Sequence, residues 1–299
     1  MSIRPVKKII QSKPTMEGAG VHLRRAFGFG DTETFDPFLL LDDFRNDRPE
    51  DYRRGFPWHP HRGIETITYV LAGTVEHGDS LGNQGALGAG DIQWMTAGSG
   101  IIHQEMPKGD REGRMHGFQL WANLPASLKM TAPRYQDVSS TDIPEVTDDD
   151  GTQARVLCGT FWGVTGPVDG ITAEPCYLDV WVPPGRRKIL PVETSRHAFA
   201  YVFAGSGTFS NASAPRAVRT DTVADAPPVA ADEAANRTLV VFDRGDEVSV
   251  QAGENGIRFL LVSGKPLQEP VAWHGPIVMN TEAELQQAVA ELRDGTFLK

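Results

Sequence analysis

The chain contains little cysteine, no run of basic residues and no long apolar segment. Cys158 and Cys176 are the only cysteines in 299 residues, which is too few for a disulfide framework. We therefore predict two buried thiols in a reducing compartment. No stretch approaches the roughly 20 apolar residues of a membrane-spanning helix, and the N-terminus lacks the apolar core of a signal peptide. These absences predict a cytosolic protein, which would also be nuclear in a eukaryotic host.

The charge balance limits the choice of partners. The formal net charge is −10 at pH 7, and no run of five basic residues occurs. Direct binding of nucleic acid depends on a basic face that neutralises phosphates, so we predict none. A protein partner, including one that itself contacts DNA, stays open.

Glycine and proline, by contrast, are abundant. The chain has 31 glycines and 21 prolines, which favours short strands joined by turns over a helical bundle. At 299 residues, of which 40% are hydrophobic, it is long enough for two β units with cores of ordinary size.

Two short motifs occur once in each half of the chain, in the same order. Tyr-Val-Leu-Ala-Gly at 69–73 resembles Tyr-Val-Phe-Ala-Gly at 201–205, and a segment from Gly-Asp to Ala-Gly at 90–98 resembles another at 245–253. Each pattern is typical of a strand bounded by a turn. Their order indicates an internal duplication.

A polar, acidic and aperiodic stretch at 139–151 predicts a linker between the halves. We place the boundary near residue 135, which gives an N-terminal domain at 1–135 and a C-terminal domain at 136–299. Runs rich in β-branched and aromatic residues predict strands in the second half, at 177–182, 238–242 and 257–262.

Two further segments of the second half have a clear pattern. The Ala/Pro-rich stretch at 211–236 predicts a long surface loop. Near the C-terminus, Thr281 and Glu284 have the spacing of a capping box, and an apolar stripe follows them. The sequence therefore predicts a helix at about 281–294.

The segment that indicates chemistry contains two pairs of potential metal ligands. His59 and His61 are two residues apart, and His103 and Glu105 repeat that spacing. In an extended strand, residues at this spacing point to the same face. If the two strands meet, three imidazoles and one carboxylate converge on a common point.

A ligand set of nitrogen and oxygen without thiolate suits Fe(II), Mn(II), Ni(II), Cu(II) or Zn(II). Four protein ligands leave coordination positions open for water, dioxygen or a substrate, as in a catalytic centre. A lone His-x-His pair occurs by chance and means little. We favour a metal site because two such pairs lie in one segment rich in turn-forming glycines.

The residues of these motifs resemble the motifs of the pirin family. The resemblance covers His-Pro-His-Arg-Gly-Ile-Glu-Thr from residue 59, Gly-Asp-Ile-Gln-Trp-Met-Thr-Ala-Gly from residue 90, Gly-Phe-Gln-Leu-Trp at 117–121 and Gly-Pro-Ile-Val-Met-Asn at 275–280. Membership would imply an all-β bicupin, with two antiparallel jelly-roll-like barrels face to face and a C-terminal helix. The family's metal, usually iron, would lie only in the N-terminal barrel, on His59, His61, His103 and Glu105.

The residues of the second half agree with a barrel that lacks metal, because the stretch 190–197 before Tyr201 contains no His-x-His and residues 254–259, directly after Gly253, contain no histidine. In the first half, three polar side chains are weaker candidates for the surroundings of the metal: Glu65, His116 and Gln119. For Glu65, a salt bridge explains its position equally well. Packing also explains Gln119 and Trp121, which share a parity.

The resemblance implies two kinds of function. One is a dioxygenase that opens the ring of a flavonol such as quercetin with O2. In this hypothesis Glu105, or Glu65 beside it, accepts the proton of a substrate hydroxyl as general base. The alternative is an iron-dependent, redox-sensing regulator that binds a transcription factor or metabolic enzyme without turnover. A purely structural zinc site ranks third, because it needs no open coordination positions.

Overall fold

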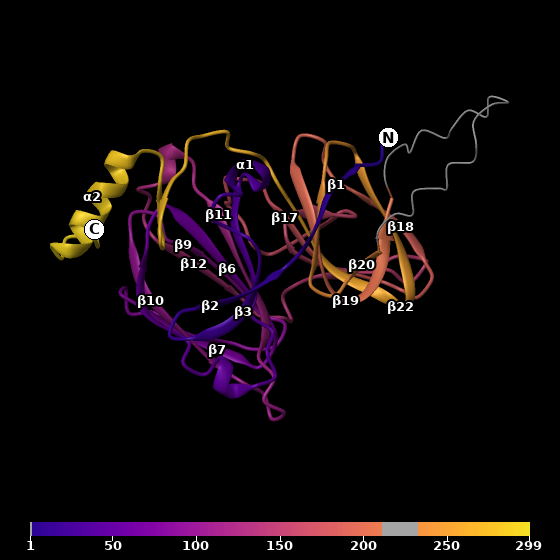
Figure 1. Ribbon diagram of the computed structural model, residues 1–299, viewed down its shortest axis with the longest axis horizontal. Coiled ribbons are helices and arrows are strands. Elements are labelled where there is room, and N and C mark those ends of the chain that lie inside the picture. Colours follow the sequence, from indigo (N-terminus) through magenta and orange to yellow (C-terminus); the bar gives the residue numbers. More distant parts are fainter. Residues whose placement is uncertain (1, 211–232) are drawn as a thin grey trace. The chain divides into compact units, whose positions relative to one another are not determined.

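The computed structural model describes residues 2–210 and 233–299, which form two compact units (Figure 1). The larger unit comprises Ser12–Pro144, Val156–Cys176 and Gly264–Lys299. The smaller unit comprises, among the described residues, 2–11, Glu145–Arg155, 177–210 and 233–263. A single division at 135/136 therefore places residues 2–11, 136–144, 156–176 and 264–299 differently from these units. The physical reason is strand pairing between segments that are distant in the sequence, which a boundary drawn from local composition does not detect.

The larger unit contains two antiparallel sheets. The seven-stranded sheet has the order β12-β9-β6-β11-β4-β3-β2. Its strands are β2 (Lys13–Glu17), β3 (Val21–Phe27), β4 (Phe38–Asp43), β6 (Ile64–Ala72), β9 (Ile92–Thr96), β11 (His116–Asn123) and β12 (Arg134–Val138). The four-stranded sheet has the order β5-β10-β7-β8. Its strands are β5 (Phe56–His61), β7 (Thr74–Asp79), β8 (Gln84–Leu87) and β10 (Ile101–Lys108).

The smaller unit is built mainly on a nine-stranded sheet, ordered β1-β21-β19-β22-β17-β14-β13, with β18 on β22 and β20 on β19. Its strands are β1 (Val6–Gln11), β13 (Glu145–Thr147), β14 (Gln153–Cys158), β17 (Cys176–Val182), β18 (Arg187–Pro191), β19 (His197–Phe209), β20 (Glu233–Ala235), β21 (Thr238–Phe242) and β22 (Glu247–Gly264). The predicted strands of the second half are confirmed as β17, β21 and part of β22.

Two local predictions need correction or restriction. The stretch at 139–151 is not entirely a linker, because its residues Glu145–Thr147 form β13 and pair with Gln153–Arg155 of β14. A three-residue strand is too short to show a periodic pattern. The predicted loop at 211–236 lies outside the described residues up to position 232. Its residues Glu233–Ala235 form β20, so the prediction is wrong for that part.

Short elements complete the fold. They are α1 (Thr32–Phe35), the 3₁₀ turns η1 (Pro49–Asp51) and η2 (Ala126–Leu128), and the strands β15 (Thr160–Phe161), β16 (Val164–Thr165), β23 (Ala272–His274) and β24 (Ile277–Met279). The all-β prediction is confirmed, with one substantial helix, α2 (Glu282–Arg293), near the C-terminus. Within the described residues, no helix has the length and apolar character needed to span a membrane.

The helix α2 begins as the sequence predicts and packs on the hairpin of β23 and β24 (Figure 1). The capping box is confirmed, since Thr281 Oγ1 accepts from the Glu284 amide and Glu284 accepts from the Thr281 amide. Leu285 and Ala288 are buried against Ile277, Met279 and Phe297. The C-terminal hairpin and helix therefore share a core within the larger unit.

The cysteines match the prediction only in part. They form no disulfide, and Cys158 is buried as predicted. Cys176 is only half-buried. It is the first residue of β17, where a strand is less enclosed than at its centre.

Candidate metal centre

The strands β5 and β10 bring the predicted ligands together. They pair antiparallel, with His103 directly opposite His59. Both His-x-His and His-x-Glu lie in extended backbone, as predicted, so each pair projects to one face. The intervening Trp58 is 54% exposed, which agrees with a side chain turned away from the site.

Three imidazoles form a tight cluster. The Nε2 atom of His59 lies 3.1 Å from Nε2 of His61 and 3.0 Å from Nε2 of His103. Among the described residues, these three form the one group of histidine, cysteine or acidic side chains with ligand atoms mutually within 4.8 Å. His61 and His103 are buried, and His59 is half-buried.

Hydrogen bonds fix which nitrogen of two imidazoles faces the cluster. Nδ1 of His59 lies 2.9 Å from the Pro57 carbonyl, and Nδ1 of His61 lies 3.2 Å from the Pro276 carbonyl. A carbonyl oxygen only accepts, so Nδ1 carries the hydrogen in both rings. Each Nε2 then presents a lone pair to the cluster, which is the arrangement of a metal-ligating histidine.

The electrostatics of the cluster favour neutral imidazoles. Burial, together with the neighbouring His59, lowers the pKa of His61 to about 3. Burial also lowers the pKa of His59 and, more strongly, that of His103. Neutral rings whose lone pairs face each other repel one another without a cation between them, and neutral imidazole is the form that binds metals.

The spacing of these nitrogens fits a six-coordinate ion. Two imidazole nitrogens each about 2.1 Å from a metal are about 3.0 Å apart at an octahedral right angle, and about 3.4 Å apart at a tetrahedral angle. The observed separations of 3.1 Å and 3.0 Å match the octahedral value. The residues present therefore fit a first-row divalent metal with open positions.

Glu105 lies near this cluster, but its role as fourth ligand stays a prediction. It lines the same cavity as His59 and His61, yet its carboxylate is not within 4.8 Å of all three ligand nitrogens. The pairing of β10 with β5 shifts in register between His103 and Glu105. The extra residue lies on β5, between Phe56 and His59, whereas β10 pairs regularly with β7, so Glu105 stays on the same face of β10 as His103.

The carboxyl of Glu105 is buried and contacts Thr68. Burial raises its pKa to about 7, although the Thr68 hydroxyl acts in the opposite direction. Thr68 Oγ1 lies 3.0 Å from Glu105 Oε1 and 2.8 Å from Gln119 Oε1. A hydroxyl has one hydrogen and can donate to only one of these oxygens. A protonated Glu105 supplies the second hydrogen, so this contact suits a carboxyl that changes its protonation state near neutral pH.

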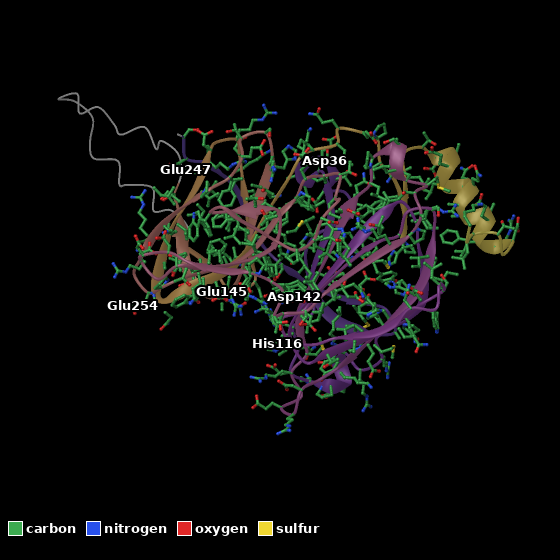
Figure 2. All side chains as sticks on the ribbon, turned by 180° about the vertical axis from the view of Figure 1, so that it is seen from behind. Asp36, His116, Asp142, Glu145, Glu247 and Glu254 are labelled. Atoms are coloured by element: carbon green, nitrogen blue, oxygen red, sulfur yellow. The ribbon has the colours of Figure 1, made fainter. Side chains whose placement is uncertain are left out.

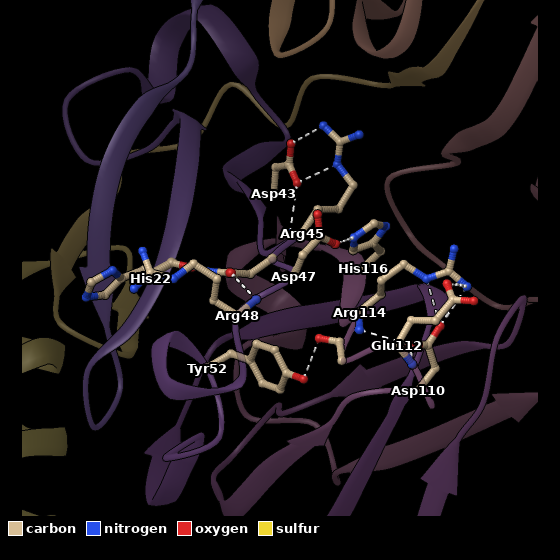
Figure 3. A network of polar contacts seen from close by, with 12 residues as sticks. His22, Asp43, Arg45, Asp47, Arg48, Tyr52, Asp110, Glu112, Arg114 and His116 are labelled. Atoms are coloured by element: carbon tan, nitrogen blue, oxygen red, sulfur yellow. Dashed lines mark hydrogen bonds and ion pairs between the residues drawn. The ribbon is translucent and has the colours of Figure 1, made fainter.

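Of the weaker candidates for the surroundings of the metal, some line the cavity and others lie away from it. Gln119 and Trp121 both line the cavity, as their shared parity suggested. Glu65 is buried but is absent from the cavity lining, and it accepts a hydrogen bond of 2.7 Å from Thr96. His116 also lies outside the cavity lining, where it pairs with Asp47 at 2.6 Å (Figure 3). Figure 2 shows His116 at the rim of its unit.

The cavity beside the imidazoles has a volume of about 600 Å³. Its wall is largely apolar and includes Phe44, Phe56 and Met115, with a charged group in which Arg25 pairs with both Asp42 and Glu17. The guanidinium of Arg25 contacts Asp42 through two hydrogen bonds, of 2.8 Å and 2.7 Å. A cavity of this size and composition suits a small aromatic molecule with a few polar groups.

The C-terminal segment contributes to this cavity, which sequence reasoning missed. Trp273, Gly275 and Pro276 all line it. The ring of Trp121 lies 5.0 Å from that of His61 and 6.1 Å from that of Trp273, while Phe29 lies 5.5 Å from Trp273. Aromatic rings therefore extend from the imidazoles to Phe29, which is 76% exposed. The motif at 275–280 was the available signal, but it gave no role to its residues.

Comparison with known proteins identifies the family. The chain matches the Pirin family over residues 20–122 and the Pirin C-terminal cupin domain over residues 177–298. A pirin-like protein of Caulobacter vibrioides is 45% identical over 298 residues, which cover 99% of this chain and 100% of that protein. Pirin of Homo sapiens is 37% identical, with 98% of this chain and 93% of that protein covered.

A solved structure supports the same assignment. The crystal structure of a quercetin 2,3-dioxygenase from Acinetobacter baumannii has a TM-score of 0.84 and 30% identity to this chain, and covers 99% of both chains. The predicted bicupin architecture is confirmed by the family matches in both halves. The chain belongs to the pirin family.

Proposed function

We propose that the larger unit is a non-haem iron dioxygenase that opens the ring of a quercetin-like flavonol with O2. His59, His61, His103 and Glu105 would hold the metal. The observation that carries this proposal is the convergence of three neutral imidazoles beside a largely apolar cavity, with Nε2 of His59 about 3 Å from Nε2 of both His61 and His103. The likeness to a quercetin 2,3-dioxygenase over the whole chain supports the choice of substrate class.

The role of each group follows from its place in the cavity lining. A bound iron ion would supply the redox chemistry with dioxygen. The aromatic rings of Trp121 and Trp273 offer faces against which a planar substrate packs. Glu105 accepts the proton of a substrate hydroxyl, because burial has raised its pKa toward neutrality and it is the buried carboxyl nearest His103 along β10. Apolar walls limit the access of water to the reacting groups.

Oxygen consumption tests the proposal directly. The protein is purified without chelator, its metals are measured by elemental analysis, and the Fe(II)-loaded form is mixed with quercetin in an oxygen electrode. Oxygen uptake together with a ring-opened product is the expected result. If the loaded protein consumes no oxygen but retains a protein partner only in one iron oxidation state, the regulator alternative replaces the enzyme.

Replacing Trp273 with alanine should weaken substrate binding more than it slows the chemistry. The Trp273 ring forms part of the cavity wall, next to Trp121 and Phe29. Loss of one stacking ring should raise KM about tenfold, while kcat changes by less than about threefold, because the contact is similar in the bound and reacting states.

The matched control for this change is Trp58→Ala. Trp58 is largely exposed, and it precedes the ligand His59, but it is absent from the cavity lining. Steady-state oxygen uptake at varied quercetin concentration measures both variants. Equal KM values in the two variants would contradict a role of Trp273 in binding the substrate.

A further inference from the structure

Two histidines of the cluster are oriented by different parts of the chain. His59 Nδ1 donates to the Pro57 carbonyl, which lies two residues earlier on the same strand. His61 Nδ1 donates to the Pro276 carbonyl, which lies 215 residues later. The orientation of His61, and the direction of its Nε2 lone pair, therefore depend on where the C-terminal segment lies.

The backbone around Pro276 is held against the residues that follow His61. Ile277 forms a parallel bridge with Arg62, and the Val278 amide donates to the Arg62 carbonyl at 3.1 Å. The ammonium of Lys129 joins the same two segments, because it donates to the carbonyls of Gly63 and Val278 at 2.9 Å each. A Cβ on Gly63 would lie 1.9 Å from the Val278 oxygen, so only glycine permits this approach.

The side chain of Arg62 holds the end of the chain. Its guanidinium donates to the Ser99 carbonyl at 2.7 Å, to the Phe297 carbonyl at 2.7 Å and to Glu291 at 2.8 Å. It also lies 4.1 Å from the centre of the Phe297 ring. Arg62 is only 2% exposed. A buried guanidinium requires partners for its donors, and two of these partners belong to α2 and the residues after it.

We infer that the C-terminal segment from Trp273 to Phe297 completes the metal centre, with the Pro276 carbonyl as a positioning group for His61 and Arg62 as the residue that holds this segment in place. The inference rests on the proposed metal site and adds an outer layer to it. The predicted ligand His61 and Arg62, which holds the C-terminal segment, are consecutive in the chain. A disturbance of the tail therefore reaches the ligand through a single peptide unit.

Shortening the chain tests this role without changing a ligand. A variant that ends at Gly295 lacks the Phe297 carbonyl and ring but keeps all of α2. The matched control is Arg293→Ala, because Arg293 is exposed on the same helix and pairs with Asp294 only, among the ion pairs of the described residues. The probe is Co(II), whose visible absorption reports both affinity and ligand geometry.

The shortened chain should bind Co(II) about 10- to 100-fold more weakly than the full chain, the usual effect of removing an outer partner of a metal ligand. Its Co(II) absorption spectrum should also change, whereas Arg293→Ala should match the wild type in both. Near-UV circular dichroism confirms that the barrel remains folded. If the shortened chain does not fold, Arg62→Lys replaces it, because an ammonium cannot reproduce the three-way contact, and the same loss is expected.

Thermodynamic linkage between metal binding and docking of the C-terminal segment provides a second measurement. A tail with a purely structural role would not give the expected result. If the segment at 276–279 favours metal binding, the metal must favour the docked segment by the same factor. Addition of Co(II) to the wild type should therefore slow hydrogen exchange of the amides at 277–279. Unchanged Co(II) affinity and spectrum in a folded shortened chain would overturn the inference alone. Failure of the wild type to bind Co(II) would instead overturn the proposed metal site, and this inference with it.

Discussion

Replacing His103 with alanine should remove the bound metal and, with it, all oxygen uptake with quercetin. His103 is 1% exposed, and its Nε2 lies 3.0 Å from that of His59. Without it, only two imidazoles and the Glu105 carboxyl remain near the site. We expect metal affinity to fall by more than about 100-fold, beyond the usual effect of an outer-shell partner.

The matched control is His116→Ala. His116 is the first residue of β11, the strand that follows β10 in the chain. Its imidazole pairs with Asp47 and is absent from the cavity lining. We expect this variant to keep the metal content and activity of the wild type. Elemental analysis and the oxygen electrode measure both proteins. A metal-loaded, active His103→Ala variant would contradict the three-imidazole centre.

Unfolding temperatures measured with and without metal should distinguish the loss of metal binding in His103→Ala from any loss of fold stability. In the metal-free protein, the His103 side chain is a buried polar group whose Nδ1 has no hydrogen-bond partner among the described residues. Its removal therefore sacrifices little hydrogen bonding but leaves a small cavity, so the metal-free variant should unfold moderately below the metal-free wild type. The stabilisation that added metal gives to the wild type should be absent from the variant, because only a ligand that binds the folded state raises its unfolding temperature.

The sequence was most informative where the chemistry is local. The spacing of two residues in His59–His61 and in His103–Glu105 requires only extended backbone to place each pair on one face, and β5 and β10 provide it. The capping box at Thr281 and Glu284 is equally local, because both hydrogen bonds lie within one helical turn.

Glu65 shares the parity of His59 and His61, which would place it on their face of one continuous strand, but parity does not extend past a turn. The chain instead leaves β5 at His61 and begins β6 at Ile64, with Gly63 at a φ of 78° between them. This turn ends the strand, so the alternation of β5 does not continue into β6. Glu65 therefore contacts Thr96 of β9 and does not reach the cavity.

The contacts that surround the centre were beyond local reasoning. Pro276 is 215 residues from His61, and no periodicity relates positions so far apart. The buried position of Arg62 could not be predicted from the sequence either, because arginine is usually exposed. Its hydrogen-bond partners Ser99 and Phe297 lie 37 and 235 residues away in the chain. Only the tertiary structure shows that these groups meet.

Replacing Glu105 with glutamine should separate proton transfer from metal binding. The amide keeps the size of the carboxyl and an oxygen that can face a metal, but it cannot accept a proton. Loss of a general base lowers kcat by about 10²- to 10⁴-fold. Metal affinity should fall far less, by about tenfold, since the three imidazoles remain. Elemental analysis of the variant and its oxygen uptake with quercetin measure the two quantities separately.

The pH profile adds a second signature to the Glu105 variant. Burial raises the pKa of Glu105 to about 7, so the carboxyl is protonated below this value and can act as a base only above it. Wild-type kcat should therefore rise with pH along an acid limb. A divalent cation nearby favours the charged carboxylate, so in the loaded protein the limb should lie at or below pH 7. In Glu105→Gln the residual rate should lose this limb.

The matched control for this experiment is Glu65→Gln. Glu65 is a second buried carboxyl of the same unit with a raised pKa, but it contacts Thr96 and is absent from the cavity lining. We expect it to retain kcat within about threefold and to keep the acid limb, because it does not touch the substrate. A Glu105→Gln variant with full activity and an unchanged pH profile would exclude Glu105 as the base. If Glu65→Gln alone abolished turnover, the proton would instead pass to that carboxyl.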